Sequence, residues 1–106
     1  MFVKVYQYHI HSDKVDQLLE IQDKTAQIYQ KYLEVHTIYL QSKRDCTKWL
    51  EISKYKNEEE YLKSITLINE DEEIQQLFKT FQSLLVSEEK EISEEDYIEK
   101  KVIGGE

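Results

Sequence analysis

The chain shows two alternating kinds of hydrophobic spacing, and together they predict a succession of strands and helices. Hydrophobic and polar residues alternate at every second position over residues 2–10, 35–41 and 48–55. This is the period of a β-strand that buries one face. Because the polar segment 42–47 separates the second run from the third, we expect these two strands to form an antiparallel hairpin. A weaker strand is expected over residues 97–103.

The first long interval between strands has helical spacing. Over residues 12–33, hydrophobic residues recur at steps of three and four, and Ser12 is the expected N-cap. The stripe predicts an amphipathic helix that packs against another element. By contrast, residues 87–96 are strongly acidic and are expected to form an exposed loop.

A second helical region follows the third strand. Asn57 and Glu60 have the spacing of a capping box, which predicts a helix start. A second box-like pair, Asn69 and Glu72, predicts that the helix restarts or kinks there. Residues 74–85 then carry the strongest helical period in the sequence.

The order of elements is therefore β-α-β-β-α-β, and it predicts an α+β fold in a single domain spanning residues 1–106. This order is typical of the ferredoxin-like arrangement, a four-stranded antiparallel sheet with two helices on one face. Right-handed crossovers place the first strand at the centre of the sheet, beside the third.

The two faces of the predicted sheet differ in character. We expect the helices to cover the aliphatic face, formed by Val3, Val5, Ile38, Leu40, Leu50 and Ile52. The opposite face would then carry five aromatic residues and one valine, namely Tyr6, Tyr8, Val35, Tyr39, Trp49 and Tyr55. Monomeric proteins seldom expose apolar patches of that size, so a second copy is expected to cover it in a homodimer. The alternative is a monomer with a solvated, tyrosine-rich sheet.

Charge and composition narrow the class of partner. The net charge is -8, with 22 acidic and 14 basic residues. Nucleic acids and anionic membranes are bound by clustered Lys and Arg, so neither is an expected partner. One cysteine excludes an internal disulfide, and no leader or long apolar run occurs in the sequence. We expect a cytoplasmic protein.

The pattern around the third strand resembles a known superfamily. A strand that ends in an aromatic residue, followed by a charged residue, a capping Asn and acidic residues, spans residues 55–61 (YKNEEEY). With the order of elements over residues 2–103, it is similar to the dimeric α/β-barrel superfamily, in particular to antibiotic-biosynthesis-monooxygenase-like domains. The resemblance implies a homodimer joined sheet to sheet and a small-molecule pocket between sheet and helices. Members include quinone-forming oxygenases without metal or flavin, heme-degrading enzymes and many proteins of no known activity.

The heme-degrading branch fits this sequence poorly. The resemblance implies an Asn on the first strand and a Trp and a His on the second helix. Here Tyr6 and Gln7 stand near the first position, and neither Trp nor His occurs after Trp49. Because heme iron needs an axial donor such as imidazole, a heme protein is the least favoured reading, and no cofactor is expected.

The aromatic face supplies the candidate site. Glu51 is a candidate base whose pKa burial would raise, and Tyr6 and Tyr39 are further catalytic candidates. Tyr8, Trp49 and Tyr55 are expected to line a pocket for a small aromatic ligand. The alternative is that all six pack in a dimer interface of a non-catalytic module, with Glu51 paired to a lysine such as Lys4.

The remaining reactive side chains carry weaker signals. His9 and His11 are two residues apart at a strand end and could form a metal pair, but zinc needs more ligands than two. His36 lies two strand spacings from His9, about 9.5 Å, so a shared site is not expected. Cys46 lies in the predicted hairpin loop and is expected to be an exposed thiol. We therefore predict no metal site.

Overall fold

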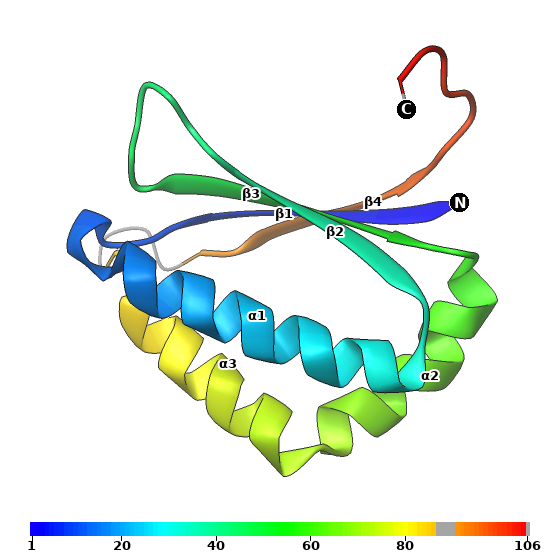
Figure 1. The fold of residues 1–106 in the computed structure, drawn as a ribbon, viewed down its shortest axis with the longest axis horizontal. Helices are drawn as coiled ribbons and strands as arrows, with labels where there is room; N and C mark the ends of the chain where they lie inside the picture. The colour runs from blue at the N-terminus through cyan, green and yellow to red at the C-terminus, as the bar shows by residue number, and fades with distance from the viewer. Residues whose placement is uncertain (87–90, 106) are drawn as a thin grey trace.

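A computed structural model describes residues 1–86 and 91–105 of the chain. Within these residues, three α-helices cover one face of a four-stranded antiparallel sheet, and none lies on the opposite face (Figure 1). The elements in chain order are β1 Phe2–His9, the 3₁₀ turn η1 Ser12–Lys14, α1 Val15–Tyr32, β2 Val35–Gln41, β3 Lys48–Tyr55, α2 Glu58–Glu70, α3 Glu72–Leu84 and β4 Ser93–Ile98. The predicted α+β, ferredoxin-like layout is confirmed.

The strand order is β2-β3-β1-β4, with every neighbouring pair antiparallel. β1 therefore lies at the centre beside β3, as the sequence predicted. The register sets Tyr6 opposite Glu51, and Glu51 opposite Tyr39 on the next strand. Residues directly opposite each other point to the same face, so these three side chains form one row.

The cap of the first helix differs from the prediction. Ser12 starts the 3₁₀ turn and does not cap it, since His11 precedes the turn without a side-chain cap bond. The α-helix itself starts at Val15, again without a side-chain cap. Its end at Tyr32 agrees with the predicted extent.

The caps of the second helical region lie close to the predicted positions. Asn57 Oδ1 accepts a hydrogen bond of 2.8 Å from the backbone N–H of Glu60, as the capping box predicted. The restart occurs at Asp71 rather than Asn69, because Asp71 Oδ1 accepts from the backbone N–H groups of Glu73 and Ile74. This cap separates α2 from α3.

The assignment of the two sheet faces was wrong. The helices lie on one side of the sheet (Figure 1). The aromatic residues of the strands line a cavity together with residues of these helices, so the helices cover the aromatic face and not the aliphatic one. Tyr8 and Trp49 are buried against Leu18 and Ile21 of α1, whereas Leu40 is 47% exposed on the open face. A cavity separates the helices from part of the sheet. Aromatic side chains are long enough to reach into this space, whereas Val and Ile are not. A twin molecule is therefore not needed to hide the tyrosines.

The last strand lies earlier in the chain than predicted, since β4 begins four residues before the expected start and ends five residues before the expected end. β4 includes part of the acidic segment 87–96, of which residues 87–90 lie outside the described residues. The side chain of Lys4 explains this shift. Its Nζ lies 2.8 Å from Glu94 Oε2 and 2.7 Å from Asp96 Oδ1, so it pairs with two carboxylates of β4. Burial lowers the pKa of Lys4, but these carboxylates more than offset that effect, and the pKa is raised overall.

Candidate functional site

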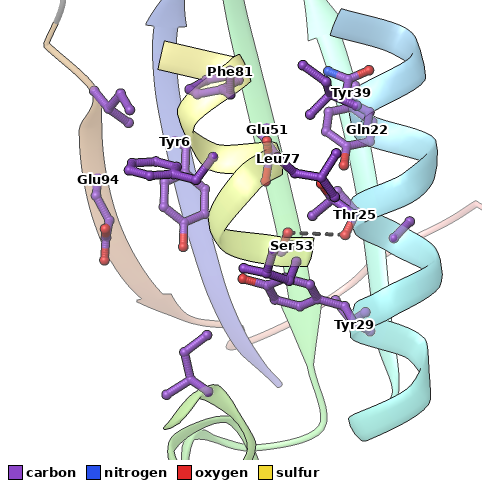
Figure 2. A pocket seen from close by; sticks show the side chains of 18 of the residues that line it. Tyr6, Gln22, Thr25, Tyr29, Tyr39, Glu51, Ser53, Leu77, Phe81 and Glu94 are labelled. Atoms are coloured by element: carbon purple, nitrogen blue, oxygen red, sulfur yellow. Dashed lines mark hydrogen bonds between the residues drawn. The ribbon is translucent and has the colours of Figure 1, made fainter. Parts of the chain in front are cut away.

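A cavity of about 570 Å³ lies between the aromatic sheet face and the three helices. The sheet contributes its floor, and α1, α2 and α3 contribute its walls. Figure 2 shows labelled side chains from several elements converging on this space, namely Tyr6 of β1, Tyr39 of β2, Glu51 and Ser53 of β3, Glu94 of β4, Gln22, Thr25 and Tyr29 of α1, and Leu77 and Phe81 of α3. Its volume falls within the range of about 300–1,000 Å³ typical of ligand pockets.

Five of the six side chains proposed from sequence line this one cavity, namely Tyr6, Tyr8, Tyr39, Glu51 and Tyr55. Trp49 does not line it. The Trp49 ring is buried in the adjacent core cluster with Tyr8, beyond the end of the cavity. Five of the residues that the sequence grouped together therefore share one cavity, although the sequence assigned them to the face away from the helices.

Glu51 is the partly buried acid of the cavity floor. The Tyr8 hydroxyl donates a hydrogen bond of 3.0 Å to Glu51 Oε1. Burial raises the pKa of Glu51, and the hydrogen bond from Tyr8 opposes this shift. The predicted pairing of Glu51 with Lys4 is wrong, because Lys4 binds Glu94 and Asp96 on the other side of β1.

The tyrosines of the cavity stay protonated well beyond the usual range. Burial raises the pKa of Tyr6, Tyr8, Tyr39 and Tyr55 above the ordinary value of 10. Burial also raises the pKa of Tyr29 to about 12. The hydroxyls therefore serve as neutral hydrogen-bond donors and acceptors at neutral pH.

The helices contribute residues that the sequence argument did not place in a site. Gln22 and Tyr29 of α1 line the cavity, as do Tyr61 of α2 and Phe81 of α3. Gln22 is 6% exposed, and among the described residues its Nε2 has no hydrogen-bond partner. A glutamine within an apolar helical stripe was the available signal, because a buried amide needs a partner.

Two pairs of neighbouring residues complete the end of the cavity near β2. Thr37 Oγ1 lies 3.1 Å from Ser53 Oγ across β2 and β3. The rings of Tyr55 and Tyr61 contact each other with centroids 4.7 Å apart. These contacts fix the side chains before any ligand arrives, which lowers the entropic cost of binding.

The histidines and the cysteine lie away from this cavity. His9 Nδ1 lies 3.0 Å from Thr47 Oγ1 at the end of β1, and Cys46 is exposed in the neighbouring loop, as predicted. His11 precedes the 3₁₀ turn, and His36 is exposed on β2. Within residues 1–86 and 91–105, no group of three or more His, Cys, Asp or Glu is arranged to hold a metal ion.

The comparisons with known proteins support the fold. No family model and no curated protein matches the chain. An uncharacterized NIPSNAP domain protein from Burkholderia xenovorans superposes with a TM-score of 0.76 at 15% identity, over 99% of this chain and 100% of that one. SnoaB, a cofactor-independent oxygenase from Streptomyces nogalater, gives 0.75 at 6% identity over 98% and 97% of the chains.

A third solved structure, described as an antibiotic biosynthesis monooxygenase, has a TM-score of 0.71 at 11% identity, over 95% of this chain and 100% of that one. The predicted resemblance to antibiotic-biosynthesis-monooxygenase-like domains is thus confirmed for the fold. At these identities the likeness concerns the fold alone. Separately, no helix in the described part of the chain has the length and apolar character needed to cross a bilayer.

Proposed function

We propose that this protein binds a small, mainly apolar molecule in the cavity between the sheet and the helices. The observation that carries the proposal is the cavity itself, about 570 Å³ in volume, with a buried carboxylate on its floor. Ligand sites typically combine apolar walls with a few polar groups that fix orientation. Here Glu51 and Gln22 are two of the polar groups within a largely aromatic lining.

This proposal competes with the simpler view that the rings are only packing. In a well-packed core, side chains fill the space to about the density of an organic crystal, and few voids exceed the size of a water molecule. A cavity of about 570 Å³ is much larger than such a void. The tyrosines also face the helices rather than a second copy, so dimer packing does not account for them.

The proposal also includes a homodimer, joined through the sheet face that the helices do not cover. Val5, Ile52 and Ile38 lie side by side across three strands in the register, and Leu50 lies opposite Leu40. This surface, which we call the open aliphatic face, consists of Val5, Ile38, Leu40, Leu50 and Ile52, whereas Val3 on the same side is buried. No helix of the described residues lies on it (Figure 1). A second copy related by a two-fold axis would cover it with an identical surface.

An NMR titration with α-naphthol tests ligand binding. The probe is neutral, aromatic and small enough for the cavity. We expect saturable shifts of the ring signals of Tyr6, Tyr39 and Phe81 and of the Ala26 methyl group, which all line the cavity. Signals on the open aliphatic face should not move. Shifts that are absent, or that grow linearly and spread over the whole surface, would contradict the proposal.

A second candidate is oxidation of the bound molecule, and the environment of Glu51 favours it. A base works best when its pKa lies near the working pH, and burial raises the pKa of this carboxyl toward that range. The cofactor-independent oxygenase from Streptomyces nogalater shares the fold, which supports the same reaction class here. In this scheme Glu51 accepts the hydroxyl proton of a phenol, and the anion passes electrons to dioxygen.

The balance of this reaction can be written for α-naphthol. One naphthol and one dioxygen give one naphthoquinone and one water, and four electrons pass from the ring to dioxygen. The ring carbon opposite the hydroxyl loses its hydrogen and gains one oxygen, while the other oxygen leaves as water. Oxygen uptake with α-naphthol tests this candidate. Uptake that is lost in Glu51→Gln would support it, and equal uptake in the two proteins would exclude Glu51 as the base.

A further inference from the structure

The charged residues that line the cavity, among those described, are all acidic. Its lining includes six tyrosines and two phenylalanines, together with two carboxylates, Glu51 and Glu94. Among the described lining residues there is no lysine, arginine or histidine. Figure 2 shows Glu51 at the centre of the site and Glu94 at its β4 side. An anionic ligand would find no opposite charge among these lining residues, whereas a cation would find Glu51, because Glu94 is already paired with Lys4.

Glu51 has room for a further partner. Its carboxylate can accept about four hydrogen bonds. The Tyr8 hydroxyl is the side-chain donor that bonds to it among the described residues. Burial raises the pKa of this carboxyl because the negative charge is poorly solvated. A positive charge brought into the cavity would supply the missing stabilisation.

The aromatic wall already holds one ammonium group at its edge. Lys4 Nζ lies 5.0 Å from the centroid of the Tyr61 ring, which lines the cavity, and 5.6 Å from that of Phe2. Both distances fall within the range of about 6 Å over which a ring face attracts a cation. Lys4 forms its ion pairs with Glu94 and Asp96, so among the described lining residues Glu51 is the carboxylate that it leaves without a cationic partner.

We propose that the cavity takes an organic cation, an ammonium group carrying an aromatic or aliphatic body. The head would lie among the tyrosine rings beside Glu51, and the apolar body would lie against Leu77 and Phe81 of α3. The proposal rests on the proposed ligand-binding function and specifies the charge of the ligand. A net charge of -8 would also raise the local concentration of cations around the molecule.

A pair of isosteric probes tests the charge directly. Benzyltrimethylammonium and neopentylbenzene have the same shape, and they differ in whether nitrogen with a positive charge or neutral carbon stands at the centre of the head. Their affinities for the intact protein are measured by NMR titration, with α-naphthol as a neutral reference. We expect the cation to bind about tenfold more tightly than the neutral isostere, since cation–π contacts and Glu51 favour the charged head alone.

The variant Glu51→Gln keeps the acceptor for Tyr8 and removes the charge. We expect it to weaken binding of the cation about tenfold while leaving neopentylbenzene unchanged. Glu20→Gln on the outer side of α1 is the matched control, since it changes the net charge equally and lies at an exposed ion pair with Lys24. It should leave both affinities as they are.

The outcomes separate the two proposals. If neopentylbenzene binds as tightly as the cation, or if Glu51→Gln and Glu20→Gln weaken cation binding equally, the cationic class is overturned. The same holds if α-naphthol binds in the cavity and benzyltrimethylammonium does not, and in that case ligand binding itself stands. If none of the three probes binds, both proposals fall.

Discussion

Tyr8 and Glu51 lie diagonally across neighbouring strands, and the Tyr8 hydroxyl donates a 3.0 Å hydrogen bond to Glu51 Oε1. This bond places a carboxylate on the floor of an aromatic cavity with little other solvation from the described residues. A buried charge of this kind is costly to the folded state. Proteins retain such costs most often where a ligand or a reaction uses the charge.

Replacing Glu51 should therefore stabilise the protein at neutral pH. Burial raises the pKa of Glu51, so the folded state favours the protonated carboxyl. That contribution to stability is complete below the ordinary pKa of 4.5 and is lost as the pH rises through the folded-state pKa. Glu51→Gln carries no ionisable group at this position and does not lose this stability as the pH rises. Its thermal midpoint should therefore exceed that of the wild type at neutral pH. The difference should shrink as the pH falls toward 4.5.

The control for this experiment is Glu20→Gln, at an exposed ion pair with Lys24. Exposed pairs of this kind contribute little, so its midpoint should stay close to that of the wild type. A lower midpoint for Glu51→Gln at neutral pH would mean that Glu51 is a structural residue.

Removing the Tyr8 hydroxyl, the hydrogen-bond partner of Glu51, should destabilise the protein. Tyr8→Phe deletes the donor to a buried carboxylate and should cost about 1–3 kcal/mol in the free energy of unfolding. In the Glu51→Gln background the cost should be smaller, because a neutral amide needs the donor less. Denaturant unfolding of the wild type, the two single variants and the double variant gives the coupling free energy between Tyr8 and Glu51. Strictly additive effects would show that the two side chains do not interact, and Tyr32→Phe, at an exposed ring, serves as the control.

The open aliphatic face should hold two copies together. Leu40→Glu places a charge on this face, where Leu40 is 47% exposed in the single chain. We expect sedimentation to show a dimer for the wild type and a folded monomer for Leu40→Glu. Leu62→Glu, at an exposed leucine of α2, should remain dimeric. A wild-type protein that sediments as a monomer at high concentration would contradict the proposed dimer.

Local pattern predicted the strands and their pairing well. The alternation over residues 35–41 gave the bounds of β2, and Asn57 caps α2 as expected. These features depend on a few neighbouring residues, which is why sequence alone reveals them. The prediction of an exposed loop over the acidic segment was wrong for the opposite reason. Glu94 and Asp96 lie in β4, where they pair with Lys4, a residue about ninety positions earlier in the chain.

The sheet faces were inverted because face assignment depends on how far the helices stand from the sheet. Residue type suggested that aliphatic side chains form the core under the helices. A signal to the contrary was present in β1, where Phe2, Tyr6 and Tyr8 share a face with Ile10, and Gln7 and His9 lie on the other. Ile10 is fully buried. The bulkier face of the central strand is the buried one.

The strand residues that line the cavity could be grouped from the sequence because they share one face of the sheet. Tyr6, Tyr39 and Glu51 form a row that alternation alone identifies. The contributions of Gln22 and Phe81 depend on the angle at which α1 and α3 cross the sheet, which no local pattern encodes.

Filling the cavity is the most direct test of the account. Ala26 lines the cavity from α1, so Ala26→Trp should occupy the ligand space, whereas Gln27→Trp places the same ring on the exposed side of the helix. Isothermal titration with α-naphthol should show saturable binding to the wild type and to Gln27→Trp, and none to Ala26→Trp. Thr25→Trp, at the adjacent wall position, should block binding as well if Ala26→Trp fails to fold. Equal binding to the filled and open proteins, or no binding to the wild type, would contradict the account.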